Sequence, residues 1–413
     1  MATWLALENI SYFLRNGSEV FICLMDMTKA FDNVKHSVLF KKLLEKGLPH
    51  VIVRLLFVMY ASQKANVRWA GQISSYFTMS NGVKQGAVLS AILYCFYTDE
   101  LFKRFRKEKL GCWIQGKFTG AVGYADDNLV MSPTLSGLQK MMEICENFAL
   151  EHNLSFSTNV IPRKSKTKCM AFLKNPRNLK RIKLNGNYLP WIDTPETVVH
   201  LGTTLDNNLR GLSRDILQKR ARYIQKNNQL IQEFYFAHPE TKCHLNNIYN
   251  MSLYGAPLWE IGSDSLNSFE YTCNRSIKIM FDLPIQTHRY LIETVSKDQH
   301  MKFKIFKRHI GFKNQVKKSS KKVLKHLYSI AENDCNSITG KNLRKIMLFC
   351  DADSISSLNF TDIDNQTYSE IPESELWRVS LLEELLMVRQ GKMDIPGFTP
   401  NEITNILDDI CIV

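Results

Sequence analysis

The sequence predicts an α+β protein in which an antiparallel sheet backed by helices is followed by a helical region. Up to about residue 208, apolar runs such as VFICLMDM and FTGAVGYADDNLVMS alternate with amphipathic helical stretches. From about residue 209 the strand-like runs give way to basic helical sequence, beginning with SRDILQKRARYIQKNNQLIQEF. We therefore expect three domains, over residues 1–208, residues 209–330 (basic and helical) and residues 331–413 (an acidic helical tail).

The individual elements follow from hydrophobic periodicity and from turn signals. Helices are predicted at residues 3–15, 37–46, 50–61, 88–108 and 134–153. Strands are predicted at 19–27 and 163–173, in a strand–turn–strand unit at 118–132, in a hairpin at 65–80 with Gly71 at its middle, and around 182–190 and 198–206. In the acidic tail, ESELWRVSLLEELLMVRQ is a helix candidate.

The charge is unevenly distributed along the chain. The 413 residues carry 53 Lys and Arg against 40 Asp and Glu, a net charge of +13. Residues 351–413 hold 13 of the acids and 3 of the bases, which leaves 50 bases and 27 acids before them, a net of +23. A body this basic indicates a polyanionic partner, because Lys and Arg displace counterions from phosphates, although a basic soluble protein is the plain alternative.

The most basic stretch offers two interpretations. Residues 300–327 contain ten Lys or Arg and no acid, with Phe303, Phe306 and Phe312 between them. The rings either stack on bases beside the phosphate contacts or form the core side of a helix whose basic face is solvated.

Cysteine usage and the lengths of apolar runs limit the cellular locations in which the protein is expected. The ten cysteines include no C-x-x-C pair and no His partners at finger spacing, which argues against structural zinc and for reduced, buried thiols. The N-terminus lacks the pattern of a signal peptide, and no apolar run reaches the roughly 20 residues of a membrane span. We expect no membrane partner and a location in the nucleus, the cytoplasm or both, not secretion.

Three carboxylates carry the strongest chemical signal. Asp126 and Asp127 are adjacent inside the apolar passage FTGAVGYADDNLVMS, where a pair of like charges is most simply a solvated turn. A hundred residues earlier, Asp26 ends another apolar strand, and if the two strands are neighbours the acids converge. Carboxylate oxygens are the ligands that Mg²⁺ prefers, and two such ions activate an attacking hydroxyl and stabilise a leaving pyrophosphate.

Five motifs in order then resemble a known family. They are DMTKAFD (26–32), NGVKQGAVLS (81–90), YADD (124–127), SKTK (165–168) and HLGTTLD (200–206). Together they resemble the palm motifs of a reverse transcriptase of the type carried by non-LTR (LINE-type) retrotransposons, over about residues 10–210. SLYGAPLWE and NRSIKIMFDLPIQTHRYLIE resemble, less specifically, the segment that follows the polymerase in these elements. The resemblance implies a right-hand polymerase palm followed by a helical, thumb-like region.

The resemblance also implies the catalytic site. Asp26, Asp126 and Asp127 would be the catalytic acids and metal ligands, holding two Mg²⁺ ions or Mn²⁺ in their place. Met27 and Thr28 follow the first acid, where family members offer backbone groups to the incoming triphosphate.

Further residues are implied around the substrate. Phe31 matches the aromatic gate against a ribose 2′-hydroxyl, with a core phenylalanine as the alternative. Gln85 and Gly86 match a loop near the nascent base pair, where the usual proline is Lys84 here. Lys166 matches the basic residue whose ammonium group neutralises or protonates the leaving pyrophosphate. An exposed strand lysine is the alternative.

The last implied group lies in the hairpin at 198–206. Leu201 and Gly202 fall at the position of the primer grip, and a tight turn of ordinary kind is the alternative.

The implied function is an RNA-directed DNA polymerase with an RNA template, a DNA primer or target and deoxynucleoside triphosphates. Only 25 residues precede Asp26, where the family places most of its fingers, so we expect an N-terminally truncated chain. The alternative is a catalytically weak or inactive nucleic-acid-binding remnant of such an element. Intron maturases and telomerase share the palm, but the two downstream segments favour a mobile element.

Overall fold

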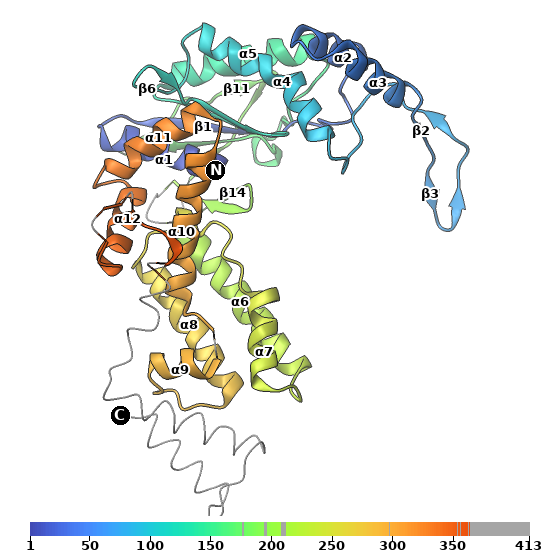
Figure 1. Cartoon of the computed structure of the whole chain (residues 1–413). Helices are drawn as coiled ribbons and strands as arrows, with labels where there is room; N and C mark the ends of the chain where they lie inside the picture. The colour runs from blue at the N-terminus through green and yellow to red at the C-terminus, as the bar shows by residue number, and fades with distance from the viewer. Residues whose placement is uncertain are drawn as a thin grey trace, which may run out of the picture. The chain divides into compact units, whose positions relative to one another are not determined.

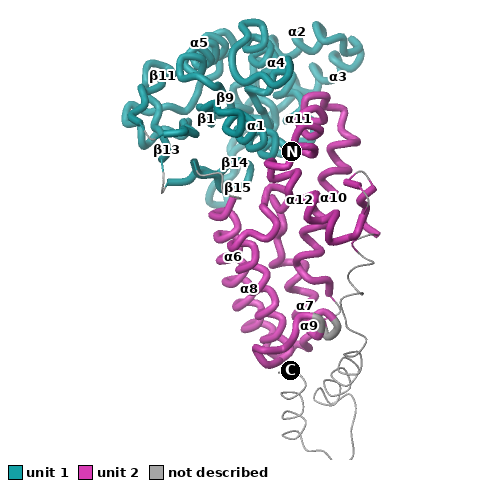
Figure 2. The backbone as a smooth tube through the Cα atoms, turned by 90° about the vertical axis from the view of Figure 1, so that its left-hand side faces the viewer, with its two compact units in different colours: residues 1–209 teal, residues 210–413 magenta. Residues whose placement is uncertain are grey.

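The computed structural model describes residues 1–175, 177–193, 196–207, 212–296, 298–352, 354–355, 357–361 and 363 (Figure 1). The chain forms two compact units, residues 1–209 and residues 210–413 (Figure 2). The predicted division into residues 1–208, 209–330 and 331–413 stays a prediction. The helix expected in ESELWRVSLLEELLMVRQ lies outside the described residues.

Unit 1 is built on a five-stranded sheet in the order β13-β10-β1-β9-β8. The strands are β1 (Val20–Met25), β8 (Ala121–Tyr124), β9 (Asp127–Ser132), β10 (Lys168–Phe172) and β13 (Trp191–Ile192). All pairs are antiparallel except β10 with β13. The central strand β1 is a nearly continuous apolar run because both of its faces are covered. The predicted α+β fold with an antiparallel sheet is confirmed.

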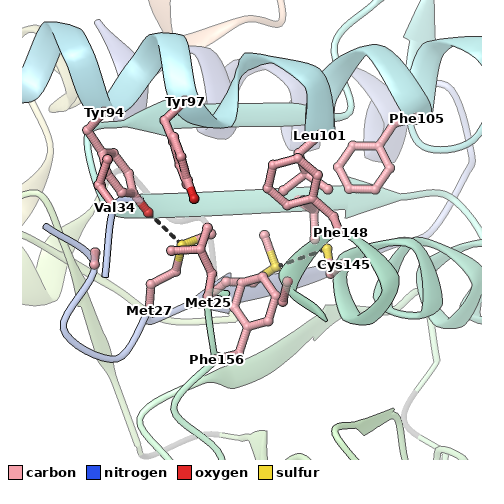
Figure 3. Packing of buried hydrophobic residues seen from close by; sticks show 14 of the residues in the cluster. Met25, Met27, Val34, Tyr94, Tyr97, Leu101, Phe105, Cys145, Phe148 and Phe156 are labelled. Atoms are coloured by element: carbon pink, nitrogen blue, oxygen red, sulfur yellow. Dashed lines mark hydrogen bonds between the residues drawn. The ribbon is translucent and has the colours of Figure 1, made fainter. Parts of the chain in front are cut away.

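Helices cover both faces of the sheet. Phe21, Cys23 and Met25 of β1 face a core formed with helices α2 (His36–Glu45), α4 (Ser90–Lys107) and α5 (Leu135–His152). Figure 3 shows part of this core, in which Met25 and Met27 lie below Tyr94 and Tyr97 of α4. Val20 and Ile22 face the other way, into a core formed with α1 (Ala2–Arg15). This alternation follows from the two-residue period of a strand.

Helix α3 (His50–Ala61) packs against α2 and leads into the predicted hairpin. In that hairpin β2 (Lys64–Ala65) pairs with β5 (Phe77–Thr78), and β3 (Arg68–Trp69) pairs with β4 (Gln72–Ile73). Other small pairs are β6 (Trp113–Ile114) with β7 (Lys117–Phe118), β11 (Lys183–Leu184) with β12 (Asn187–Tyr188), and β14 (Val198–His200) with β15 (Thr203–Leu205).

In its described residues, unit 2 is helical. Its α-helices are α6 (Ser213–Glu233), α7 (Pro239–Leu245), α8 (Asp264–Phe281), α9 (Arg289–Ser296), α10 (Met301–Lys318), α11 (Lys322–Asn333) and α12 (Ile338–Phe349). Phe303 and Phe306 of α10 are buried and contact each other and Phe349. For these two rings the core interpretation is right and base stacking is wrong. Phe312 is only partly buried and contacts Tyr328.

Candidate active site

The three predicted acids meet at one end of the sheet. In the pairing of β1 with β9, Met25 lies opposite Asn128, so the next residue along β1, Asp26, falls opposite Asp127. Tyr124 pairs with Asp127 across the β8–β9 hairpin, which leaves Ala125 and Asp126 as its two-residue turn. The sheet thus brings together two segments that are 100 residues apart in sequence.

The strand alternation gives Asp26 and Asp127 a common side. Val20 and Ile22 of β1 lie on the face covered by α1, together with Leu129 and Met131 of β9. Asp26 and Asp127 continue these two series at the end of the sheet. Asp26 and Asp126 are partly buried and Asp127 is exposed, so water and ions reach the acids.

The charges of the three carboxylates oppose one another. Although Asp127 is exposed, neighbouring atoms remove part of the water around its carboxyl; this desolvation, and then the charges of Asp126 and Asp26, raise the pKa of Asp127 above its usual range. Within the described part of the chain, no Lys, Arg or His forms an ion pair with any of the three. A cluster of acids without a compensating cation is chemically suited to accept one from solution.

The donor set fits a hard divalent cation, but the side chains are not arranged around one. Among the described residues, no three His, Cys, Asp or Glu side chains stand in a geometry that already holds a metal ion. Mutual repulsion keeps carboxylates apart when no cation neutralises them. Accessible aspartate side chains change rotamer at small cost, so a cation from solution can draw the three carboxylates together.

The tip of the hairpin is positioned by residues that sequence reasoning missed. A Cβ on Gly123 would lie 2.9 Å from the Phe102 ring of α4 and 2.9 Å from Asn128 Oδ1, so only glycine permits this approach. The buried Asn128 donates from Nδ2 to the carbonyl of Asp126 (3.1 Å). Both residues stand inside the GYADDN stretch, but a single sequence does not show which ring approaches Gly123.

The segment after Asp26 is held by the chain around residue 156. The N–H of Thr28 donates to the carbonyl of Ser155 (2.8 Å), and the N–H of Ser157 donates to the carbonyl of Asp26 (2.8 Å). The Thr28 amide is therefore already bonded, and it would contact a triphosphate only if this pairing opened. Its predicted role, and that of Met27, stay predictions.

Tyr94 connects this segment to the acids, and sequence reasoning missed it as well. Its buried hydroxyl donates to the sulfur of Met27 (2.6 Å), as Figure 3 shows. Burial, and then the charge of Asp126, raise the pKa of the Tyr94 phenol. The ring of Phe31 is half-buried, with its centroid 5.2 Å from that of Tyr94. Phe31 thus contributes to the core and also keeps an accessible edge, so its role as a gate stays a prediction.

The loop with Gln85 and Gly86 is attached to the same segment. The N–H of Val83 donates to the carbonyl of Phe31 (2.8 Å), and Gln85 Nε2 lies 3.4 Å from Asp32 Oδ1. Gly86 is exposed and has a φ of 80°, in the left-handed region that favours glycine. The structure therefore places this loop beside the segment that follows Asp26.

Lys166 lies on the other side of β1. It is exposed between the buried residues Ser165 and Thr167, and the hydroxyl of Thr167 accepts from the N–H of Asp26 (3.2 Å). Its side chain forms no ion pair among the described residues. The location is compatible with both interpretations of Lys166.

Leu201 and Gly202 form the turn between β14 and β15. Their φ values of 47° and 73° are those of a two-residue hairpin turn with both central residues left-handed. The predicted turn is present, and its role as a primer grip stays a prediction.

Comparison with known proteins finds a matching family model and similar retrotransposon proteins. The family model for reverse transcriptase (RNA-dependent DNA polymerase) matches residues 6–205, a range that includes all three acids. The Pol polyprotein of the type-2 retrotransposable element R2DM of Drosophila melanogaster is 30% identical over 123 residues, which is 30% of this chain and 12% of that protein. The Pol polyprotein of the type-1 element R2 of Nasonia vitripennis is 26% identical over 183 residues, 44% of this chain and 17% of that protein.

A solved structure of telomerase from Candida albicans, in complex with a fragment of telomeric RNA, is also similar. It shares 13% identity with a TM-score of 0.35, covering 87% of this chain and 54% of that one.

Among the described residues, no helix has the length and apolar character needed to cross a membrane. Residues 6–205, just under half of the chain, form a reverse transcriptase domain, and the chain is similar to the polyproteins of non-LTR retrotransposons.

Proposed function

We propose that this chain is an RNA-directed DNA polymerase that joins a deoxynucleoside triphosphate to the 3′-hydroxyl of a primer on an RNA template. The observation that carries the proposal is the meeting of Asp26, Asp126 and Asp127 at accessible strand ends without a compensating cation. The match of residues 6–205 to the reverse transcriptase family model supports the reaction class.

The chemistry divides among the residues of the site. Asp26, Asp126 and Asp127 would hold two divalent cations, Mg²⁺ or Mn²⁺. When bound, such ions lower the pKa of the attacking hydroxyl and stabilise the leaving pyrophosphate. Phe31 excludes a 2′-hydroxyl with a rigid ring edge, and Lys166 supplies a mobile positive charge for the pyrophosphate.

The partners follow from this reaction. We infer an RNA template, a DNA primer or target and deoxynucleoside triphosphates, bound by a chain with a net charge of +13. A location in the nucleus, the cytoplasm or both is part of the proposal. All nine cysteines among the described residues are free thiols; seven are buried as expected, whereas Cys95 and Cys335 are exposed. Free thiols are compatible with a reducing compartment.

Primer extension on an RNA template tests the proposal. The comparison is between the wild-type chain, Asp126→Asn, and Asp193→Asn as a matched control, since Asp193 is an exposed acid of the same unit. Loss of one group that stabilises developing charge costs about 10²-fold or more in rate, so Asp126→Asn is expected to lose at least that much. Extension that survives in Asp126→Asn at the wild-type rate would refute the site.

Two observations favour a second candidate function, a nucleic-acid-binding remnant without efficient catalysis. The Thr28 amide is already bonded to Ser155, and the described acids do not form a ready metal cluster. Filter binding at several salt concentrations distinguishes the two functions. A wild-type chain that binds nucleic acid with a steep salt slope yet extends no primer is a remnant.

A further inference from the structure

The hairpin over residues 64–78 is an arm that carries three exposed aromatic rings. Figure 1 shows it projecting beyond the end of α3, with β2 and β3 labelled. Trp69 is 80% exposed, Tyr76 72% and Phe77 51%. Rings of this size bury 150–250 Å² each when a partner covers them, so three exposed rings on one hairpin are suited to contact a partner.

The charge around these rings has one sign. Between Lys46 and Asp99 the sequence contains no Asp or Glu, while Arg54, Lys64 and Arg68 are positive and exposed. Neither Lys64 nor Arg68 forms an ion pair among the described residues. The arm therefore presents cations that no neighbouring carboxylate of its own segment neutralises.

We propose that the arm binds single-stranded nucleic acid, with bases stacked on Trp69 and Tyr76 and with phosphates on Lys64 and Arg68. Exposed rings among unpaired cations form the kind of platform that binds single strands, because every base offers a flat face and every nucleotide a negative charge. A duplex already covers the faces of its bases, so the rings contribute little to duplex binding. The choice of a nucleic acid as the polyanion rests on the proposed polymerase function, whereas the binding itself does not depend on catalysis.

The geometry of the hairpin defines how a single-stranded nucleic acid would lie on it. Arg68 pairs with Ile73 and Trp69 with Gln72, around a turn at Ala70 and Gly71. Because successive residues of a strand face opposite sides, Arg68 and Trp69 lie on opposite faces. A flexible nucleic acid strand contacts both residues where it passes across the edge of the arm.

The arm is continuous with the candidate active site through the loop that carries Gln85. At its base, the N–H of Met79 donates to the carbonyl of Gln63 (3.0 Å). Two residues later Asn81 bridges to Lys35, and the loop then packs against the segment after Asp26. A strand on the arm is thus bound by the same stretch of chain that leads to the site.

The test is the affinity of the full chain for labelled single-stranded RNA and DNA oligonucleotides and for an RNA duplex. Measurement at about 0.3 M salt reduces the contribution of non-specific phosphate contacts. The control for Trp69→Ala is Tyr235→Ala, since Tyr235 is 77% exposed but lies between the exposed acids Glu233 and Glu240. Trp69 and Tyr235 are both on the surface, so both variants should keep the wild-type melting temperature. An unchanged melting temperature shows that a variant is folded.

Trp69→Ala is expected to weaken single-strand binding about 5- to 100-fold, the range for loss of one stacking ring. Tyr235→Ala and binding of the duplex should change less than about twofold. If Trp69→Ala loses more affinity for the RNA oligonucleotide than for the DNA oligonucleotide, the arm binds RNA, and the reverse result identifies DNA. The double variant Lys64→Glu with Arg68→Glu should also bind more weakly and show a shallower salt slope.

Unchanged single-strand affinity in Trp69→Ala would overturn the proposal, and so would an equal loss for the duplex. If Trp69→Ala instead converts a dimer to a monomer at constant RNA affinity, the arm is a protein contact and the proposal is wrong. Because the affinity measurement needs neither a nucleotide nor primer extension, its outcome separates failure of the arm from failure of the active site.

Discussion

The two units place aspartates in opposite environments. In unit 2, Asp215 is 2% exposed, and its Oδ2 accepts from Lys219 Nζ (2.6 Å) and from Trp259 Nε1 (2.9 Å). In unit 1, the carboxylates of Asp26, Asp126 and Asp127 are accessible, repel one another and form no ion pair among the described residues. Asp215 is buried with its cation, whereas the three accessible acids of unit 1 are available to a cation from solution.

The largest effect predicted from this contrast concerns Asp215. Asp215→Ala leaves the Lys219 ammonium and the buried Trp259 N–H without their acceptor, which costs about 3–5 kcal/mol. Urea denaturation at pH 7 measures the change in the free energy of unfolding. A loss below about 1 kcal/mol would show that the pair contributes little and would remove the contrast.

Acid should destabilise unit 2 through its buried histidines. Burial lowers the pKa of His309 to about 4, and burial with nearby cations lowers the pKa of His300 to about 3. Each group stays neutral in the folded state while the unfolded chain binds a proton, so stability is lost as pH falls below about 6.5. The loss from His309 alone is on the order of 3 kcal/mol by pH 4.

Nuclear magnetic resonance of the histidine rings, with the exposed ring of His50 as a reference, checks this prediction. The His309 signals should remain those of a neutral ring at pH 5.5 in the folded protein. A His309 ring that is protonated at that pH would contradict the account.

A smaller effect is expected at the hairpin that carries two of the acids. Gly123→Ala forces a Cβ to within 2.9 Å of the Phe102 ring, which costs about 1–3 kcal/mol and displaces Asp126 and Asp127. The matched control is Gly311→Ala on α10, where the new Cβ meets Phe360 at an ordinary 3.7 Å. Alanine there should stabilise the helix by about 0.5–1 kcal/mol. Equal effects of the two changes on unfolding would contradict the packing described for Gly123.

The smallest effect concerns Asp127 itself. Ionisation of this carboxyl is unfavourable in the folded state, so stability decreases as pH rises through its usual titration range. Without divalent ions, Asp127→Asn should therefore stabilise unit 1 at pH 7 by a few tenths of a kcal/mol, because solvent screens the repulsion. Asp99→Asn is the control, since it removes an ion pair with Lys103 (3.1 Å) and should destabilise slightly. Denaturation of both variants in the presence of a chelator measures the sign of the change in the free energy of unfolding.

Much of unit 1 could be predicted because its signals are local. The apolar run VFICLM is the central strand β1, and GYADDN is the tip of the β8–β9 hairpin. The helix expected at 88–108 is Ser90–Lys107. What could not be predicted depends on residues far apart in sequence, such as the bond from Thr28 to Ser155 and the approach of Phe102 to Gly123.

The basic stretch in unit 2 shows the same limit. Composition alone gave Phe303 and Phe306 two equally open roles. Their burial is decided by contacts with Phe349, which lies more than 40 residues further along the chain. A helix with apolar and basic faces has the same sequence pattern whether its rings meet a core or a base.

Binding of Mn²⁺, measured by electron paramagnetic resonance with primer–template and deoxynucleotide present, tests the central claim most directly. The wild-type chain should bind about two ions at the carboxylates. The double variant Asp26→Asn with Asp126→Asn should lose them while retaining its fold. Equal stoichiometry and affinity in the two proteins would show that these acids do not hold the metal.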